Sequence, residues 1–299
     1  MADPRELTQD LRDAGQQAAG GVQAGVERGV RRAAPGLEAL ARFGYVSKGV
    51  VYATVGLLAL ALAFGRGGQA TDAQGALRRL GDLPLGSALI WPLALGLFGY
   101  ALWQLLRALL DPEGLGQETK ALAKRAAYLL SALINFALFW FAVRLAGEGR
   151  VRSGAGEAAA AREVLSLPAG QLWLGLAGVL LLGAGAAQVI EAVRGTFMRR
   201  VVLRDAAGRH AGKIRRIGQL GLGARGVTFA ALGAFLLTAA AADEARRVRD
   251  SSGLLTWLRD QPAGEWLLAL SALGTFCYGL WCFVQARYRR IGLVEPSGT

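Results

Sequence analysis

The sequence is poor in the residues that carry most active-site chemistry. It has two cysteines and one histidine, His210, among 299 residues. Two cysteines cannot form a disulfide framework, and one histidine excludes a histidine-rich metal site. Charged residues are also few, at 19%, while hydrophobic residues reach 53%, which excludes an intrinsically disordered chain. We therefore expect no catalytic residues, no metal and no cofactor, and hence a protein that is not an enzyme.

Acidic residues are outnumbered, with 22 Asp and Glu against 34 Lys and Arg and a net charge of +12. In a soluble protein this excess would suggest nucleic-acid binding. The aromatic residues here lie mostly inside apolar runs instead of among the basic ones, so we expect no nucleic-acid partner. Cytoplasmic loops of membrane proteins accumulate Lys and Arg, which is the simpler explanation.

Six windows of 21 residues are apolar enough to cross a bilayer as helices. Asp and Glu are absent from all six, and alternating apolar and polar residues, the mark of transmembrane strands, are absent too. The sequence therefore predicts an all-α polytopic membrane protein. The windows are 44–64, 86–106, 126–146, 170–190, 222–242 and 266–286.

The loops differ in positive charge. Lys and Arg number 23 on the side of the two termini and 11 on the other side. The richer side is expected to be cytoplasmic, which places the protein in the inner membrane with both termini inside. Cysteines introduced at positions 205 and 154 should therefore react with a membrane-impermeant thiol reagent from opposite sides. Labelling of both from outside intact cells would contradict this topology.

The chain repeats itself three times. Each even-numbered span is preceded by Pro-x-Gly, at 84–86, 168–170 and 262–264. Proline suits the first turn of a helix, where its missing N–H is not needed. Each repeat contains two spans, so the repeats are parallel, and three parallel hairpins predict a pseudo-threefold six-helix bundle.

The expected parts are an N-terminal cytosolic tail at 1–40, repeat 1 at 41–115, repeat 2 at 116–198, a basic cytosolic loop at 199–216, repeat 3 at 217–290 and a C-terminal tail at 291–299.

Repeats 1 and 3 are the more alike. GYVSKGVVYATVG at 44–56 aligns with GLGARGVTFAALG at 221–233, so that Lys48 aligns with Arg225. Between the spans of each hairpin, the segments 71–83, 157–167 and 249–261 read as short amphipathic helices on the outer interface. Repeat 2 has diverged and lacks the Lys or Arg that aligns with Lys48 and Arg225.

The pattern ARFGYVSKGVVYATVG, TDAQGALRRLGDLPLG and ALGLFGYALWQLLRAL resembles the bacterial membrane family catalogued as domain of unknown function 1206. The resemblance covers about residues 42–290. It implies three tandem two-helix units in a membrane. It implies no activity and therefore no catalytic residues.

Lys48 and Arg225 are the main candidate site residues, because a charge at membrane depth suggests a function. Two interpretations remain open. Either both side chains reach the cytoplasmic rim by snorkelling, which their depth of one to two turns favours, or they line a hydrated vestibule that accepts anions. A dry arrangement with both cations facing an axis is the least favoured, because like charges repel in a low dielectric.

Other polar positions lie within or at the ends of spans. Asn135 near mid-membrane, one turn after Ser131, is expected to bridge helices, with solute coordination as the alternative. Arg107 and Glu191 are repeat equivalents that would pair if they met across an axis, although separate interfacial charges are the favoured interpretation. The remaining candidates at the cytoplasmic helix ends are Gln104, Gln188 and Gln285.

The loop between spans 4 and 5 is expected to lie on anionic lipid headgroups, because positive charge dominates it. Its candidate lipid contacts are Arg199, Arg200, Lys213, Arg215 and Arg216. For the whole protein we favour a non-catalytic role as a structural or accessory partner, in contact with another membrane protein or a second copy. A passive channel or transporter with a site on the pseudo-threefold axis is the alternative, and a membrane-embedded enzyme is less favoured.

Overall fold

The computed structural model describes residues 35–111, 116, 118–149, 163–203, 206–242 and 251–291. Six helices in this part of the chain are long and apolar enough to cross a membrane. Each corresponds to one of the six predicted spans, which confirms the all-α membrane fold. In chain order they are Pro35–Ala63, α3 (Gly86–Leu110), α4 (Thr119–Glu148), α6 (Gly170–Arg194), α8 (Ala211–Ala242) and α10 (Gly264–Tyr288).

Short helices precede α3 and α10, as the amphipathic patterns predict. They are α2 (Ala73–Gly81) and α9 (Ser251–Arg259). Asp72 caps α2, because its Oδ1 accepts a hydrogen bond from the Gly75 backbone N–H at 2.7 Å. Of the corresponding segment of repeat 2, 157–167, the structure describes only 163–167. Of the two predicted tails it describes only 35–40 and 291, so the rest of these predictions lies outside the described residues. Two further short helices, η1 (Thr196–Arg200) and α7 (Ala206–Arg209), follow α6.

The Pro-x-Gly motif makes the same turn in all three repeats. Its middle residue, Leu85, Ala169 or Ala263, has a positive φ of 62°, 58° or 59° and caps the following helix, which begins at the glycine. The expectation that the proline occupies the first helical turn is therefore wrong. A side chain on Gly86 would lie 2.0 Å from the Gly81 carbonyl oxygen, and one on Gly264 equally close to that of Arg259. Glycine is needed because the chain doubles back directly onto the preceding short helix.

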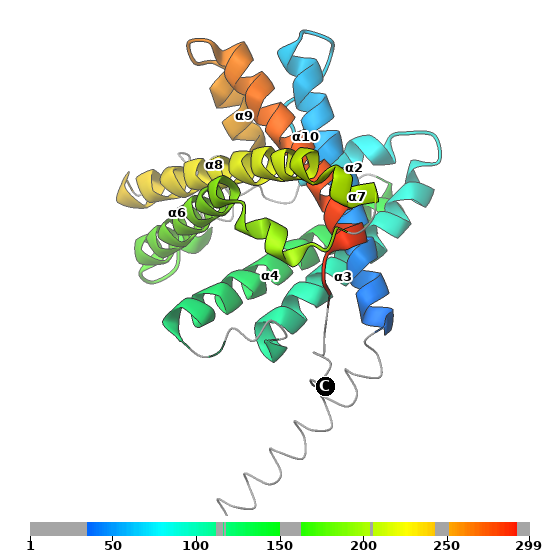
Figure 1. Cartoon of the computed structure of the whole chain (residues 1–299). Coiled ribbons are helices and arrows are strands. Elements are labelled where there is room, and N and C mark those ends of the chain that lie inside the picture. The colour runs from blue at the N-terminus through cyan, green and yellow to red at the C-terminus, as the bar shows by residue number, and fades with distance from the viewer. Residues whose placement is uncertain are drawn as a thin grey trace, which may run out of the picture.

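The six long helices form an open ring (Figure 1). The first, Pro35–Ala63, lies between α3 and α10, since Gly44 contacts Tyr100 of α3 and Gly49 contacts Phe283 of α10. Helix α8 packs against both α10 and α6, and α4 packs against α3. The first helix of a repeat thus lies beside the second helix of its own repeat and of a neighbouring one, which is the pseudo-threefold pattern. Repeat 2 departs from it, because α4 and α6 do not pack substantially on each other.

Candidate functional site

Most of the polar residues singled out from the sequence are buried inside this ring. Lys48 is only 2% exposed, and Arg107, Gln104 and Asn135 are nearly as inaccessible. Arg225 is partly exposed. The snorkelling interpretation of Lys48 is therefore wrong: its side chain is directed into the bundle, where aromatic side chains surround it.

Five residues form a connected group, here called the cation–tyrosine cluster: Lys48, Tyr52, Tyr100, Arg225 and Tyr278. The Lys48 ammonium lies 3.9 Å from the centre of the Tyr100 ring and 5.7 Å from that of Tyr52. The Arg225 guanidinium lies 6.0 Å from the centre of the Tyr52 ring. Both cations are therefore close to a single tyrosine, and each is held by the negative faces of aromatic rings.

The same contact between a cation and a tyrosine occurs in repeat 1 and in repeat 3. In repeat 1, Lys48 of the first helix contacts Tyr100 of α3. In repeat 3, Arg225 of α8 lies 4.6 Å from the ring centre of Tyr278 of α10 and donates a hydrogen bond from Nη1 to its hydroxyl. The Tyr52 and Tyr278 rings pack edge to face at 4.9 Å and join the two halves. The same cation–tyrosine pair thus occurs at the same place in two of the three repeats.

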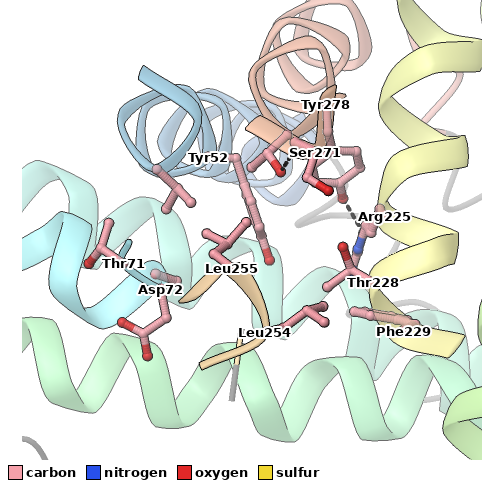
Figure 2. Close-up of a pocket in the computed structure, with 13 residues that line it drawn as sticks. Tyr52, Thr71, Asp72, Arg225, Thr228, Phe229, Leu254, Leu255, Ser271 and Tyr278 are labelled. Carbon is pink, nitrogen blue, oxygen red and sulfur yellow. Dashed lines mark hydrogen bonds between the residues drawn. The ribbon is translucent and has the colours of Figure 1, made fainter. Parts of the chain in front are cut away.

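No carboxylate forms an ion pair with either cation of the cluster in the described part of the chain. Asp72 lies in the wall of the same cavity, but Figure 2 shows its carboxylate pointing away from Arg225, and it is occupied in capping α2. The Arg225 Nε is buried and has no hydrogen-bond partner among the described residues. Among the described residues, Lys48 and Arg225 contact aromatic rings, and Arg225 also donates to a tyrosine hydroxyl.

A cavity of ≈ 100 Å³ adjoins the cluster (Figure 2). Tyr52, Arg225 and Tyr278 line it, together with Thr71 and Leu254 from the segments at α2 and α9. Hydroxyl groups of Thr228, Ser271 and Thr275 add polar atoms to its wall. The cavity therefore joins residues of α2 and α9 to a guanidinium and has room for an anion with a few waters.

Two more buried cations lie toward the ends of α3 and α10. Arg107 donates from Nη1 to the Gln104 side chain at 2.7 Å and lies 3.6 Å from the centre of the Tyr128 ring. Arg289 donates in the same way to Gln285 at 2.6 Å and lies 5.4 Å from the Tyr45 ring. Tyr45 packs edge to face on Tyr100 of the cluster at 5.1 Å, so these groups extend its positive interior.

The remaining candidate residues contact groups on their own helix or on the segment that follows it. Asn135 donates to the Ser131 carbonyl of its own helix at 2.7 Å, so the expectation that it bridges helices is wrong. Gln188 likewise contacts Ala184 on α6. Glu191 pairs with Arg200 at 3.0 Å and not with Arg107, in agreement with the favoured interpretation that the two repeat equivalents stay apart.

The basic segment after α6 packs against the end of α10. The Phe197 ring of η1 lies edge to face on Trp281 at 4.9 Å, and the Val202 N–H donates to the Tyr288 carbonyl at 2.9 Å. The five candidate lipid contacts, Arg199, Arg200, Lys213, Arg215 and Arg216, are all exposed. Their contact with anionic lipid stays a prediction.

The tyrosines of the cluster were not identified as site residues from the sequence. One signal was available, because Tyr100 and Tyr278 occupy equivalent places in Tyr-x-Leu-Trp of repeats 1 and 3. Tyr52 gives no such signal, since its equivalent in repeat 3 is Phe229. Its role depends on where the two halves of the ring meet, which the repeat pattern alone does not give.

The fold and the buried cluster define a polytopic α-helical membrane protein built from three parallel hairpin repeats. The chain belongs to the family described as Domain of Unknown Function (DUF1206), whose model matches residues 43–111, 126–195 and 220–289. It is also similar to the uncharacterized protein YxxB of Bacillus subtilis (strain 168), with 31% identity over 258 residues, covering 86% of this chain and 93% of that protein. No solved structure matches significantly.

Proposed function

We propose that this protein is a non-catalytic inner-membrane protein that binds a small inorganic anion at the cation–tyrosine cluster and provides a passive pathway for it. The observation that carries the proposal is the approach of Lys48 and Arg225 to one tyrosine, Tyr52, with no carboxylate ion pair to either cation among the described residues. Burying two like charges is costly, and a bound anion offsets both the repulsion and the lost hydration.

The cavity supports a pathway in addition to binding. It reaches the cluster from the segments at α2 and α9, which are expected on the outer face of the membrane. Tyrosine hydroxyls and the free Arg225 Nε provide hydrogen-bond donors for an anion.

With the proposed orientation, both termini and the basic segment after α6 lie in the cytoplasm, where the exposed arginines contact anionic lipid.

Chloride efflux from proteoliposomes tests the pathway. The wild-type protein should release chloride faster than protein-free liposomes when valinomycin clamps the potential. Arg225→Met should reduce the rate at least about tenfold, because a charge-assisted hydrogen bond contributes about 1.5–3 kcal/mol. The matched control is Arg79→Met, since Arg79 is an exposed cation on α2 outside the cavity. Efflux at the protein-free rate, or equal efflux in Arg225→Met and wild type, would reject the pathway.

A structural or accessory role is the second candidate. The observation that favours it is the opening of the ring in repeat 2, where, among the described helices, α4 packs mainly on α3 and α6 mainly on α8. This role and the anion pathway are compatible, because the opening and the cluster involve different helices.

A further inference from the structure

Three helices meet at the end of the ring where the first helix begins and where α3 and α10 end. Arg42 of the first helix donates to the Ala286 carbonyl oxygen at 2.8 Å and to that of Arg289 at 3.3 Å, which holds this helix against the end of α10. Tyr45, about one turn further along, packs in one hydrophobic cluster with Trp103 of α3. In the proposed orientation this is the cytoplasmic end of the ring.

Two hydrogen-bond donors at this end lack an acceptor. The Tyr45 hydroxyl and the Trp103 indole N–H are buried and make no hydrogen bond among the described residues. The two residues are only 2% and 3% exposed, so bulk water does not reach them. Buried polar groups in folded proteins almost always have a partner, and an indole N–H can only donate. The group that is missing here is therefore a hydrogen-bond acceptor.

Positive charge surrounds these two donors. The Arg289 guanidinium lies 5.4 Å from the centre of the Tyr45 ring, and Arg107, near the end of α3, also interacts electrostatically with Tyr45. Both arginines are buried. Each is oriented by a glutamine, since Arg107 donates to Gln104 at 2.7 Å and Arg289 donates to Gln285 at 2.6 Å. An acceptor placed among these groups is favoured if it is negatively charged.

We infer that Tyr45, Trp103, Arg107 and Arg289, here called the helix-end cluster, bind a phosphate group. The planar guanidinium matches an oxyanion better than a halide, because its N–H groups donate in parallel to two oxygens. A phosphate has further oxygens for the hydroxyl and the indole N–H. The phosphate is either inorganic or part of a phospholipid headgroup. These residues are not those of the cation–tyrosine cluster, so the inference goes beyond the proposed anion pathway and does not depend on it.

The melting temperature of delipidated protein in detergent tests the site and its source of phosphate. One arm titrates inorganic phosphate, and the other titrates dioctanoyl phosphatidylglycerol against dioctanoylglycerol, which lacks the phosphate. Chloride is held constant, so that the cation–tyrosine cluster contributes equally throughout. A rise with inorganic phosphate assigns a free anion, and a rise with phosphatidylglycerol alone assigns a lipid headgroup. No rise in either arm rejects the site.

Two conservative variants test the donors. Tyr45→Phe and Trp103→Phe each remove one donor and keep an aromatic ring. Each should weaken binding of the effective probe about tenfold, because a hydrogen bond to a charged group is lost. The matched control is Trp173→Phe, since Trp173 is 55% exposed on α6, and it should bind like the wild type. Wild-type affinity in both Tyr45→Phe and Trp103→Phe would mean that water satisfies the two donors, and would reject the site.

Arg225→Met separates this site from the proposed anion pathway. It removes the guanidinium of the cation–tyrosine cluster and leaves the helix-end cluster intact. The variant should therefore keep the rise in melting temperature with the effective probe while it loses chloride efflux. A lost response to the probe in Arg225→Met would place the phosphate at the cation–tyrosine cluster and overturn the inference.

Discussion

Replacing Lys48 by methionine is expected to raise the melting temperature of the protein in chloride-free detergent. Lys48 is 2% exposed, and among the described residues its ammonium lies against the Tyr100 and Tyr52 rings with no carboxylate partner. Removing an ion from water costs several kcal/mol, and a desolvated cation–π contact returns about 2 kcal/mol. Methionine has a similar length and fills irregular spaces well. We expect a gain of about 1–3 kcal/mol in the free energy of unfolding.

The same variant should lose its response to chloride. A ligand that binds only the folded state at 100 times its Kd stabilises that state by about 2.7 kcal/mol. Titrating chloride should therefore raise the melting temperature of the wild type but not that of Lys48→Met, with an inert anion of equal ionic strength as reference. Arg79→Met is the matched control and should respond like the wild type, because Arg79 is exposed on α2. If Lys48→Met is less stable and still responds to chloride, Lys48 serves packing and not an anion.

Stability and function are thus expected to oppose each other at the cation–tyrosine cluster. A chain selected for stability alone would place an uncharged residue at position 48, as repeat 2 does with Ser131 at the equivalent position. Repeats 1 and 3 instead keep a cation against a tyrosine in each case. The arrangement is understandable if the buried charge is needed for a ligand.

The spans and the repeats were predictable because the bilayer sets helix length and because each even-numbered span follows the same Pro-x-Gly turn. The direction of Lys48 was not predictable from its depth. A lysine one to two turns inside a helix can extend to the headgroups or turn inward, and the choice depends on which face packs against neighbours. Here Tyr100, far along the chain on α3, provides the inward partner.

The opening in repeat 2 is a second feature that sequence similarity alone concealed. The alignment of the three repeats suggested equal hairpins, yet Gly96 of α3 is replaced by Leu180 in α6, whose side chain is 58% exposed. Repeat 2 therefore has a larger residue at the position where Gly96 approaches Gly44 in repeat 1. Asn135 shows the same limit, because its sequence position indicated the need for a partner but not that its own helix supplies one at Ser131.

Replacing Gly56 by valine is expected to separate the first helix from α10 and to destabilise the protein strongly. A Cβ at this position would lie 2.5 Å from the Phe276 backbone nitrogen of α10. Backbone atoms cannot rotate away as a flexible side chain can, so the first helix and α10 must separate. Overpacking typically costs 1–3 kcal/mol, and a clash with backbone belongs at the upper end, at about 3 kcal/mol or more. The repeat-equivalent Gly233, at 2.7 Å from the Leu182 nitrogen of α6, should behave alike.

The melting temperature in detergent measures this effect, and the yield of monodisperse protein after purification gives a second measure. The matched control is Gly147→Val, because Gly147 also lies in a long helix, α4, but nothing is within 4 Å of its added Cβ. Both variants lose the same helical glycine and gain the same β-branched side chain, so helix propensity cancels in the comparison. The difference between them isolates the contact of the first helix with α10. Equal melting temperatures for the two variants would mean that this contact does not hold the ring together.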